Sequence, residues 1–156
     1  MIRVMMLAGV LIMTSTAAAA QEPMPFEWSP QYRAWAGHIS DALVVSQVTA
    51  DTVHSMRQLA KWEAVRCQSL RYAAVLGSTE ATKRLVHRTR PDGSDDKSFF
   101  SMHTALAFAA SGWKVEIGIP IAAGAGYGRM AADKHFLTDV IAGLFTGLGA
   151  QQLCDK

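Results

Sequence analysis

A histidine and an aspartate near the carboxyl end of the chain have the residue types and spacing of a nucleophile and its supporting carboxylate. His135 and Asp139 are four residues apart, so on a helix they share one face. A carboxylate there can accept the imidazole Nδ1 proton, fix the tautomer and leave Nε2 to attack an electrophile. Arg129 adds a cation six residues before the histidine. The alternative from these residues alone is a solvated helix face with a local His–Asp contact.

Two cations upstream have the spacing of an anion-binding pair. Lys83 and Arg90 are seven residues apart, about two helical turns, so both can project from one face. A compact ammonium beside a forked guanidinium suits a tetrahedral oxyanion. The same residues also fit a solvated, basic helix end that complements the helix dipole.

A third cluster lies where the chain enters a predicted helix. A loop that leads into a helix offers backbone N–H groups to an anion, and Ser101 adds a hydroxyl donor beside Met102. His103, just inside the helix, can give a proton to a leaving group. The alternative is an ordinary serine N-cap followed by an exposed histidine.

Together and in this order, the three clusters resemble the type 2 phosphatidic acid phosphatase and vanadium haloperoxidase superfamily. Its signature reads K-x-x-x-x-x-x-R-P, then P-S-G-H, then S-R-x-x-x-x-x-H-x-x-x-D. The matching residues are Lys83, Arg90, Pro91, Ser101, His103, Arg129, His135 and Asp139. The resemblance therefore covers residues 83–139.

Three positions depart from that signature. Phe100 stands in place of the proline, Met102 in place of the glycine, and Gly128 in place of the serine before the arginine. Met102 matters most, because in the family the backbone N–H of this glycine approaches the phosphate. A methionine side chain must find room there, and a positive φ would be strained.

The resemblance implies a phosphatase that acts on phosphomonoesters. The phosphoryl oxygens would be held by Lys83, Arg90, Arg129, Ser101 and the Met102 amide. His135 would attack phosphorus and form a phosphohistidine, Asp139 would orient it, and His103 would protonate the departing alkoxide. The resemblance implies no metal and no cofactor, because three cations supply the charge stabilisation. Orthovanadate is expected to bind as an inhibitor.

The N-terminal residues have the layout of a secretory signal. Arg3 precedes an apolar stretch that ends near Met13, and small residues follow as far as Ala20. We expect cleavage near Gln21 and a periplasmic or secreted protein, with a short membrane anchor as the alternative. Residues 21–30 hold three prolines and are interpreted as an irregular leader, and residues 31–156 as the phosphatase domain.

Hydrophobic residues at three- and four-residue spacings predict an all-α, single-domain bundle of five or six helices. Asp51 is expected to begin a second helix, and Gly77-Ser78 to end one helix and start another. Residues 91–98 are polar and predict a surface loop. Asp133 is expected to cap a last helix that includes His135 and runs to about residue 152.

Composition narrows the class of protein. The chain has 156 residues, half of them hydrophobic, with 15 Lys+Arg against 13 Asp+Glu, which excludes a disordered chain and disfavours a nucleic-acid partner. No apolar stretch after the signal is long enough to span a bilayer.

In an exported protein Cys67 and Cys154 can form a disulfide, and two buried thiols are the alternative. The partner we expect is a small phosphorylated substrate, and the oligomeric state is left open.

Three other functions remain compatible with these residues. An apolar surface docked on a membrane would favour a lipid-phosphate phosphatase. A vanadate-dependent haloperoxidase shares the same anion-binding residues. A non-catalytic phosphate-binding protein is suggested by Met102 and by the missing proline at position 100.

Overall fold

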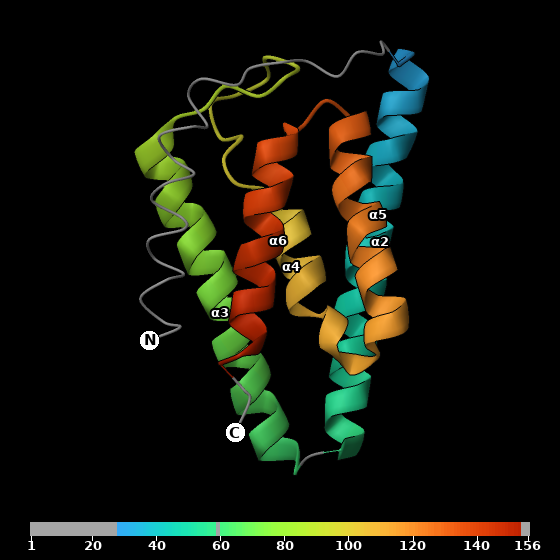
Figure 1. The fold of residues 1–156 in the computed structure, drawn as a ribbon, viewed down its shortest axis with the longest axis vertical. Helices are drawn as coiled ribbons and strands as arrows, with labels where there is room; N and C mark the ends of the chain where they lie inside the picture. Colours follow the sequence, from blue (N-terminus) through green and yellow to red (C-terminus); the bar gives the residue numbers. More distant parts are fainter. Residues whose placement is uncertain (1–27, 59, 154–156) are drawn as a thin grey trace.

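Two long helices frame the molecule, close together at one end and apart at the other (Figure 1). The computed structural model describes residues 28–58 and 60–153. The helices are α2 (Pro30–Gln58), α3 (Lys61–Val86), α4 (Met102–Ala109), α5 (Val115–Ala131) and α6 (Leu137–Gln151), with a short 3₁₀ helix, η1, at Ser111–Trp113. The described residues include no strand, and the predicted all-α, single-domain fold is confirmed.

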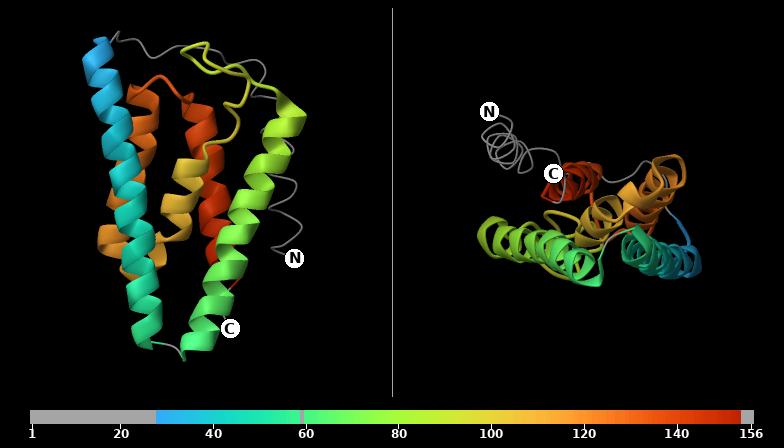
Figure 2. Two further views of the ribbon diagram at one scale, coloured as in Figure 1. Left: turned by 180° about the vertical axis from the view of Figure 1, so that it is seen from behind. Right: turned by 90° about the horizontal axis from the view of Figure 1, so that it is seen from below.

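The shortest α-helix, α4, lies at the centre of the bundle (Figure 2). It contacts α2, α3, α5 and α6, and its apolar residues contribute to both larger core clusters. The amino ends of α4 and α6 and the carboxyl ends of α3 and α5 face the same end of the molecule (Figure 1). The predicted site residues come from these ends.

Glycines on α6 set how closely it approaches α4. A Cβ added at Gly147 would lie 2.7 Å from Phe108 Cβ and closer still to the Ala105 carbonyl oxygen. A Cβ at Gly143 would lie 2.6 Å from the Ser101 carbonyl oxygen. Because real Cβ atoms do not approach other atoms this closely, the glycines fix the α4–α6 separation and with it the position of the start of α4.

A buried polar cluster joins α2, α3 and α4. Asp51 Oδ2 accepts hydrogen bonds from Arg71 Nη1 at 2.9 Å and from the Tyr72 hydroxyl at 2.7 Å. Arg71 Nη1 also donates to the carbonyl oxygen of Ala109 at 3.1 Å. The prediction that Asp51 begins a helix is therefore wrong: it lies within α2, where its carboxylate is buried and paired.

The predicted break at Gly77-Ser78 is also wrong, because both residues lie inside α3. An interior glycine costs a helix only about 1 kcal/mol relative to alanine. Its neighbours Val75 and Thr79 are buried against the bundle, and this packing outweighs the local preference. The helix ends at Val86, and the polar residues 91–98 form the predicted loop.

The last helix begins later than predicted. Asp133 does not cap it: this residue has a left-handed backbone, with φ of 53°, and its carboxylate pairs with Arg33 Nη1 at 2.7 Å. The helix starts at Leu137, so His135 lies in the preceding turn. The cap comes from Asp139, whose Oδ2 accepts from the Phe136 backbone N–H at 3.0 Å.

Some sequence-based predictions lie outside the described residues. They are the signal at residues 1–20, residues 21–27 of the leader, and Cys154. The Cys67–Cys154 disulfide therefore stays a prediction.

Two glycine substitutions distinguish the effect of close helix packing on stability from the effect of backbone conformational freedom. Gly147→Ala should lower the free energy of unfolding by about 1–3 kcal/mol, because the new methyl group overpacks the α4–α6 contact. Gly77→Ala should raise it by about 0.5–1 kcal/mol, since a Cβ at position 77 meets nothing within 4 Å inside a helix. Urea unfolding of both variants measures the difference, and a stabilised Gly147→Ala protein would contradict this account of the packing.

Candidate active site

Predicted site residues from separate segments meet at one end of the bundle. They are Lys83 in the last turn of α3, Arg90 in the following loop, His103 in the first turn of α4, Arg129 in the last turn of α5, and His135 before α6. Burial lowers the pKa of Lys83, and the nearby charges of Arg90 and Arg129 lower it further. The structure thus places the three cations within electrostatic range of one another, and both imidazoles within range of Arg129.

The loop that carries Arg90 is held by its own aspartates. Arg90 Nε donates to Asp95 Oδ1 at 2.6 Å, and the Arg90 backbone N–H donates to the Asp95 carbonyl oxygen at 2.9 Å. Asp92 pairs with Lys134 Nζ at 2.5 Å, which ties the loop to the α5–α6 turn. These contacts bring Arg90 towards Arg129 and His135.

His135 is buried, and its tautomer is set by a backbone carbonyl. Its Nδ1 lies 2.7 Å from the Ser98 carbonyl oxygen. A carbonyl can only accept, so Nδ1 carries the hydrogen, and in the neutral ring Nε2 keeps its lone pair. Burial lowers the pKa of His135, although the neighbouring Asp139 opposes this shift. The ring is therefore held in its neutral form at neutral pH.

Asp139 is not the direct acceptor that the sequence predicts. Its Oδ2 lies 3.8 Å from His135 Nδ1, because the histidine precedes α6 and the two residues do not share a helical face. The carboxylate is fully buried and accepts from Arg88 Nη1 at 2.6 Å and from the Ser98 hydroxyl at 2.5 Å. Burial raises the pKa of Asp139, but His135, Ser98 and Arg88 together hold it below its ordinary value.

Arg88 is a site residue that the sequence reasoning missed. Its side chain is buried, its Nη1 also contacts the Thr138 hydroxyl at 2.7 Å, and its guanidinium lies 4.2 Å from the centre of the Phe136 ring. Arg88 thereby links the loop after α3 to the start of α6. In the sequence it stands within a run of basic residues, and only its burial distinguishes it from an exposed cation.

Asp41, on α2, is the second missed residue. Its Oδ1 lies 2.9 Å from His103 Nε2 and 3.2 Å from Arg129 Nη1. Burial and the charge of Arg129 lower the pKa of His103 to about 4, and the Asp41 carboxylate opposes this by favouring the protonated ring. No local spacing connects Asp41 to these residues, so the sequence carried no signal for it.

Ser101 and Met102 begin α4 in ordinary geometry. Ser101 is the N-cap, and its fully buried hydroxyl oxygen accepts from the Thr104 hydroxyl at 3.0 Å. Met102 is the first helical residue, and it is not among the residues with positive φ. The backbone strain considered for a methionine here is therefore absent, and its amide is one of the N–H groups without a partner inside the helix.

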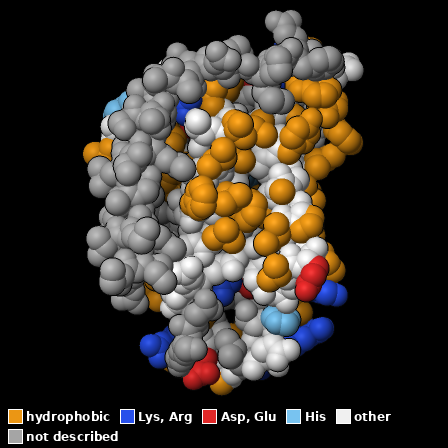
Figure 3. Space-filling model, viewed as in Figure 1, with side chains coloured by type: hydrophobic (Ala, Val, Ile, Leu, Met, Phe, Trp, Pro, Cys, Tyr) orange, Lys and Arg blue, Asp and Glu red, His pale blue; other side chains and the backbone are white. Residues whose placement is uncertain are grey.

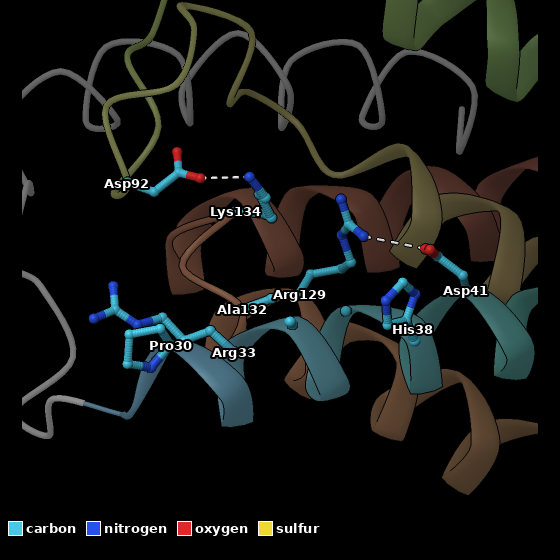
Figure 4. Close-up of a pocket in the computed structure, with 10 residues that line it drawn as sticks. Pro30, Arg33, His38, Asp41, Asp92, Arg129, Ala132 and Lys134 are labelled. Carbon is cyan, nitrogen blue, oxygen red and sulfur yellow. Dashed lines mark hydrogen bonds and ion pairs between the residues drawn. The ribbon is translucent and has the colours of Figure 1, made fainter.

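A cavity of about 580 Å³ lies beside these residues, between the first turns of α2 and the α5–α6 turn (Figure 4). Arg129 and Asp41 line it, so it adjoins the cluster of imidazoles and cations through these two residues. Among the residues the structure describes, no group of three or more His, Cys, Asp or Glu side chains is placed to hold a metal ion.

Comparison with known proteins adds one similarity. The chain is 32% identical over 91 residues to the lipid A 1-phosphatase of Porphyromonas gingivalis, a match that covers 51% of this chain and 20% of that protein. The chain therefore spans about a fifth of the length of this curated relative. No family model matches, and no solved structure matches. The name of this relative agrees loosely with the superfamily that the sequence resembles.

The role of Arg88 can be measured through stability. Arg88→Met should lower the free energy of unfolding by about 3–5 kcal/mol, because it leaves the buried Asp139 carboxylate without its cation. The matched control is Arg84→Met in the last turn of α3, whose exposed ion pair with Glu80 should contribute little to stability. Similar values for the two variants in urea unfolding would show that the Arg88 pair is not structural.

Proposed function

We propose that the chain is an exported phosphatase that hydrolyses phosphomonoesters through a phosphohistidine and without a metal ion. The observation that carries the proposal is the meeting of His135 and His103 with Lys83, Arg90 and Arg129, which come from five separate segments of the chain. Two imidazoles beside three cations suit the transfer of a dianionic phosphoryl group.

His135 is the proposed nucleophile. Because the Ser98 carbonyl accepts from Nδ1, the lone pair on Nε2 is available to attack phosphorus. The N–P bond forms as the P–O bond to the leaving group breaks, and the electron pair passes to the leaving oxygen. Water then attacks the phosphohistidine, releases inorganic phosphate and restores the imidazole.

His103 is the proposed general acid. It would give its proton to the leaving oxygen, so that an alcohol and not an alkoxide departs. Asp41 would position this ring and stabilise its protonated form, since its carboxylate lies 2.9 Å from Nε2. The dianionic substrate would raise the pKa of His103 further when it binds beside the ring.

The oxyanion-binding groups in this proposal are Lys83, Arg90, Arg129 and the Met102 amide. They would supply positive charge and hydrogen bonds where the phosphoryl oxygens gain negative charge. Vanadate, which adopts the five-coordinate shape of the transition state, would bind the same groups. Ser101 would contribute only if its own hydroxyl hydrogen turned towards the substrate, since its oxygen already accepts from Thr104.

A second candidate function is a membrane-docked lipid-phosphate phosphatase. Hydrophobic side chains gather over α5 and α6 on the face seen in Figure 3. The exposed large hydrophobic residues of these two helices include Ile117, Leu137 and Phe145. The relative is named as a lipid A phosphatase, which also favours this function. Within the described residues no helix is both long and apolar enough to cross a membrane. Turnover of a lipid phosphate in vesicles, with none of soluble esters, would favour this candidate.

Leaving-group dependence tests the roles of the two histidines. His135→Ala should abolish turnover of every phosphomonoester, because the nucleophile is needed whatever group departs. His103→Ala should lower kcat/KM for an alkyl phosphate by roughly 10²–10⁴-fold, and much less for p-nitrophenyl phosphate, whose leaving group is stable as an anion. Thermal melting checks that both variants fold. Equal losses with the two substrates would remove His103 from the proton-transfer step.

The pH profile tests the contact between Asp41 and His103. With the pKa of His103 near 4, the acid form becomes scarcer as pH rises, so kcat/KM for an alkyl phosphate should fall on the alkaline side. Asp41→Asn removes the charge that raises this pKa, so the falling limb should move to lower pH. Asp96→Asn removes the same charge from an exposed loop residue that pairs with His87, and it should leave the profile in place. Identical shifts in both variants would contradict a direct effect of Asp41.

A further inference from the structure

The cavity beside the candidate active site shares two residues with it. Asp41 contacts both His103 and Arg129, and Asp41 and Arg129 also line the cavity. A phosphoryl group held by Arg129, with its leaving oxygen near His103, would therefore direct the rest of the substrate towards this cavity. Its volume of about 580 Å³ falls within the range of small-molecule sites, roughly 300–1,000 Å³.

The cavity surface is poor in large apolar side chains. Among the residues that the structure describes, its uncharged lining consists of Pro30, Ala34, Gly37 and Ala132 together with His38, and these include no Leu, Ile, Val, Met, Phe, Tyr or Trp. These described residues offer no large apolar side chain to an acyl chain and no large aromatic ring on which a nucleobase could stack. Small residues do allow a flat, compact group to approach the backbone of α2.

The charged residues around the cavity are already paired. Arg33 contacts Asp133 at 2.7 Å, Lys134 contacts Asp92 at 2.5 Å, and Arg129 contacts Asp41 at 3.2 Å. Figure 4 shows the last two pairs on opposite sides of the cavity. A second anionic group would have to break an ion pair to bind, whereas a hydroxyl can donate to the carboxylate and accept from the cation of the same pair.

We propose that this cavity is a subsite for a polyhydroxylated, sugar-like leaving group, so that the preferred substrate is a sugar phosphate. The inference rests on the proposed phosphatase function and names its substrate class. The paired donors and acceptors would recognise adjacent hydroxyls, and Ala34, Gly37 and Ala132 would face the C–H surface of the ring.

The test compares leaving groups of similar size with and without hydroxyls. For the full chain, kcat/KM for glucose 1-phosphate should exceed that for n-hexyl phosphate by at least about tenfold, the equivalent of one or two hydrogen bonds. Ala34→Leu, which fills the cavity without changing charge, should remove most of this difference. Methyl phosphate, which does not reach the cavity, should be hydrolysed by this variant at nearly the original rate.

Ala42→Leu is the matched control, because Ala42 is exposed on the same helix and does not line the cavity. It should leave the glucose 1-phosphate preference intact. Equal kcat/KM values for the sugar and hexyl esters would overturn the subsite, and so would a sugar preference that persists in Ala34→Leu. Turnover of methyl phosphate in the same experiment would still support the proposed phosphatase activity. Failure to hydrolyse any of the three esters would overturn the proposed function and the subsite together.

Discussion

The buried carboxylate of Asp139 holds together the parts of the chain that form the candidate site. It accepts from Arg88 in the loop after α3, from the Ser98 hydroxyl further along that loop, and from the Phe136 backbone N–H at the start of α6. A buried carboxylate without such partners would be strongly disfavoured. The contacts with Arg88 and Ser98 therefore constrain the loop and the helix to one relative position, and Ser98 in turn presents the carbonyl that orients His135.

Clustered positive charge is the second constraint on this end of the bundle. Arg90, Arg129 and Lys134 each lie within ion-pair distance of an aspartate, namely Asp95, Asp41 and Asp92. These carboxylates offset the repulsion among cations that burial would otherwise strengthen. Asp41 comes from α2 and Asp92 from the loop, so their pairs also attach α2 to the end of α5 and the loop to the α5–α6 turn.

The position of α4 depends on a different interaction, the close contact of small side chains. Gly143 and Gly147 bring α6 against α4, and Gly126 on α5 lies so close to Thr104 that a Cβ there would be 3.3 Å from its hydroxyl oxygen. A short helix packed on all sides in this way has little freedom to shift. His103 in its first turn is thereby held opposite Asp41 and Arg129.

The sequence by itself determined the helical class and the order of the three charged clusters. The helical class and the cluster order both follow from local patterns. The spacing of hydrophobic residues predicts helices, and the motif residues between 83 and 139 occur at fixed intervals. The loop at residues 91–98 could also be predicted from the sequence, because its polar, turn-forming residues determine the backbone conformation locally.

Only the tertiary structure decided which groups those residues contact. Asp41 lies 88 positions before Arg129, and the carbonyl that binds His135 belongs to Ser98, 37 positions before it. Every residue has a backbone carbonyl, so the sequence does not indicate that the one at Ser98 binds a histidine. Asp41 lies on a long helix without a partner at a nearby sequence position, so the sequence does not indicate its contacts either. Likewise Gly77 continues α3 because Val75 and Thr79 are buried, and burial is a property of the packed bundle that residue spacing does not contain.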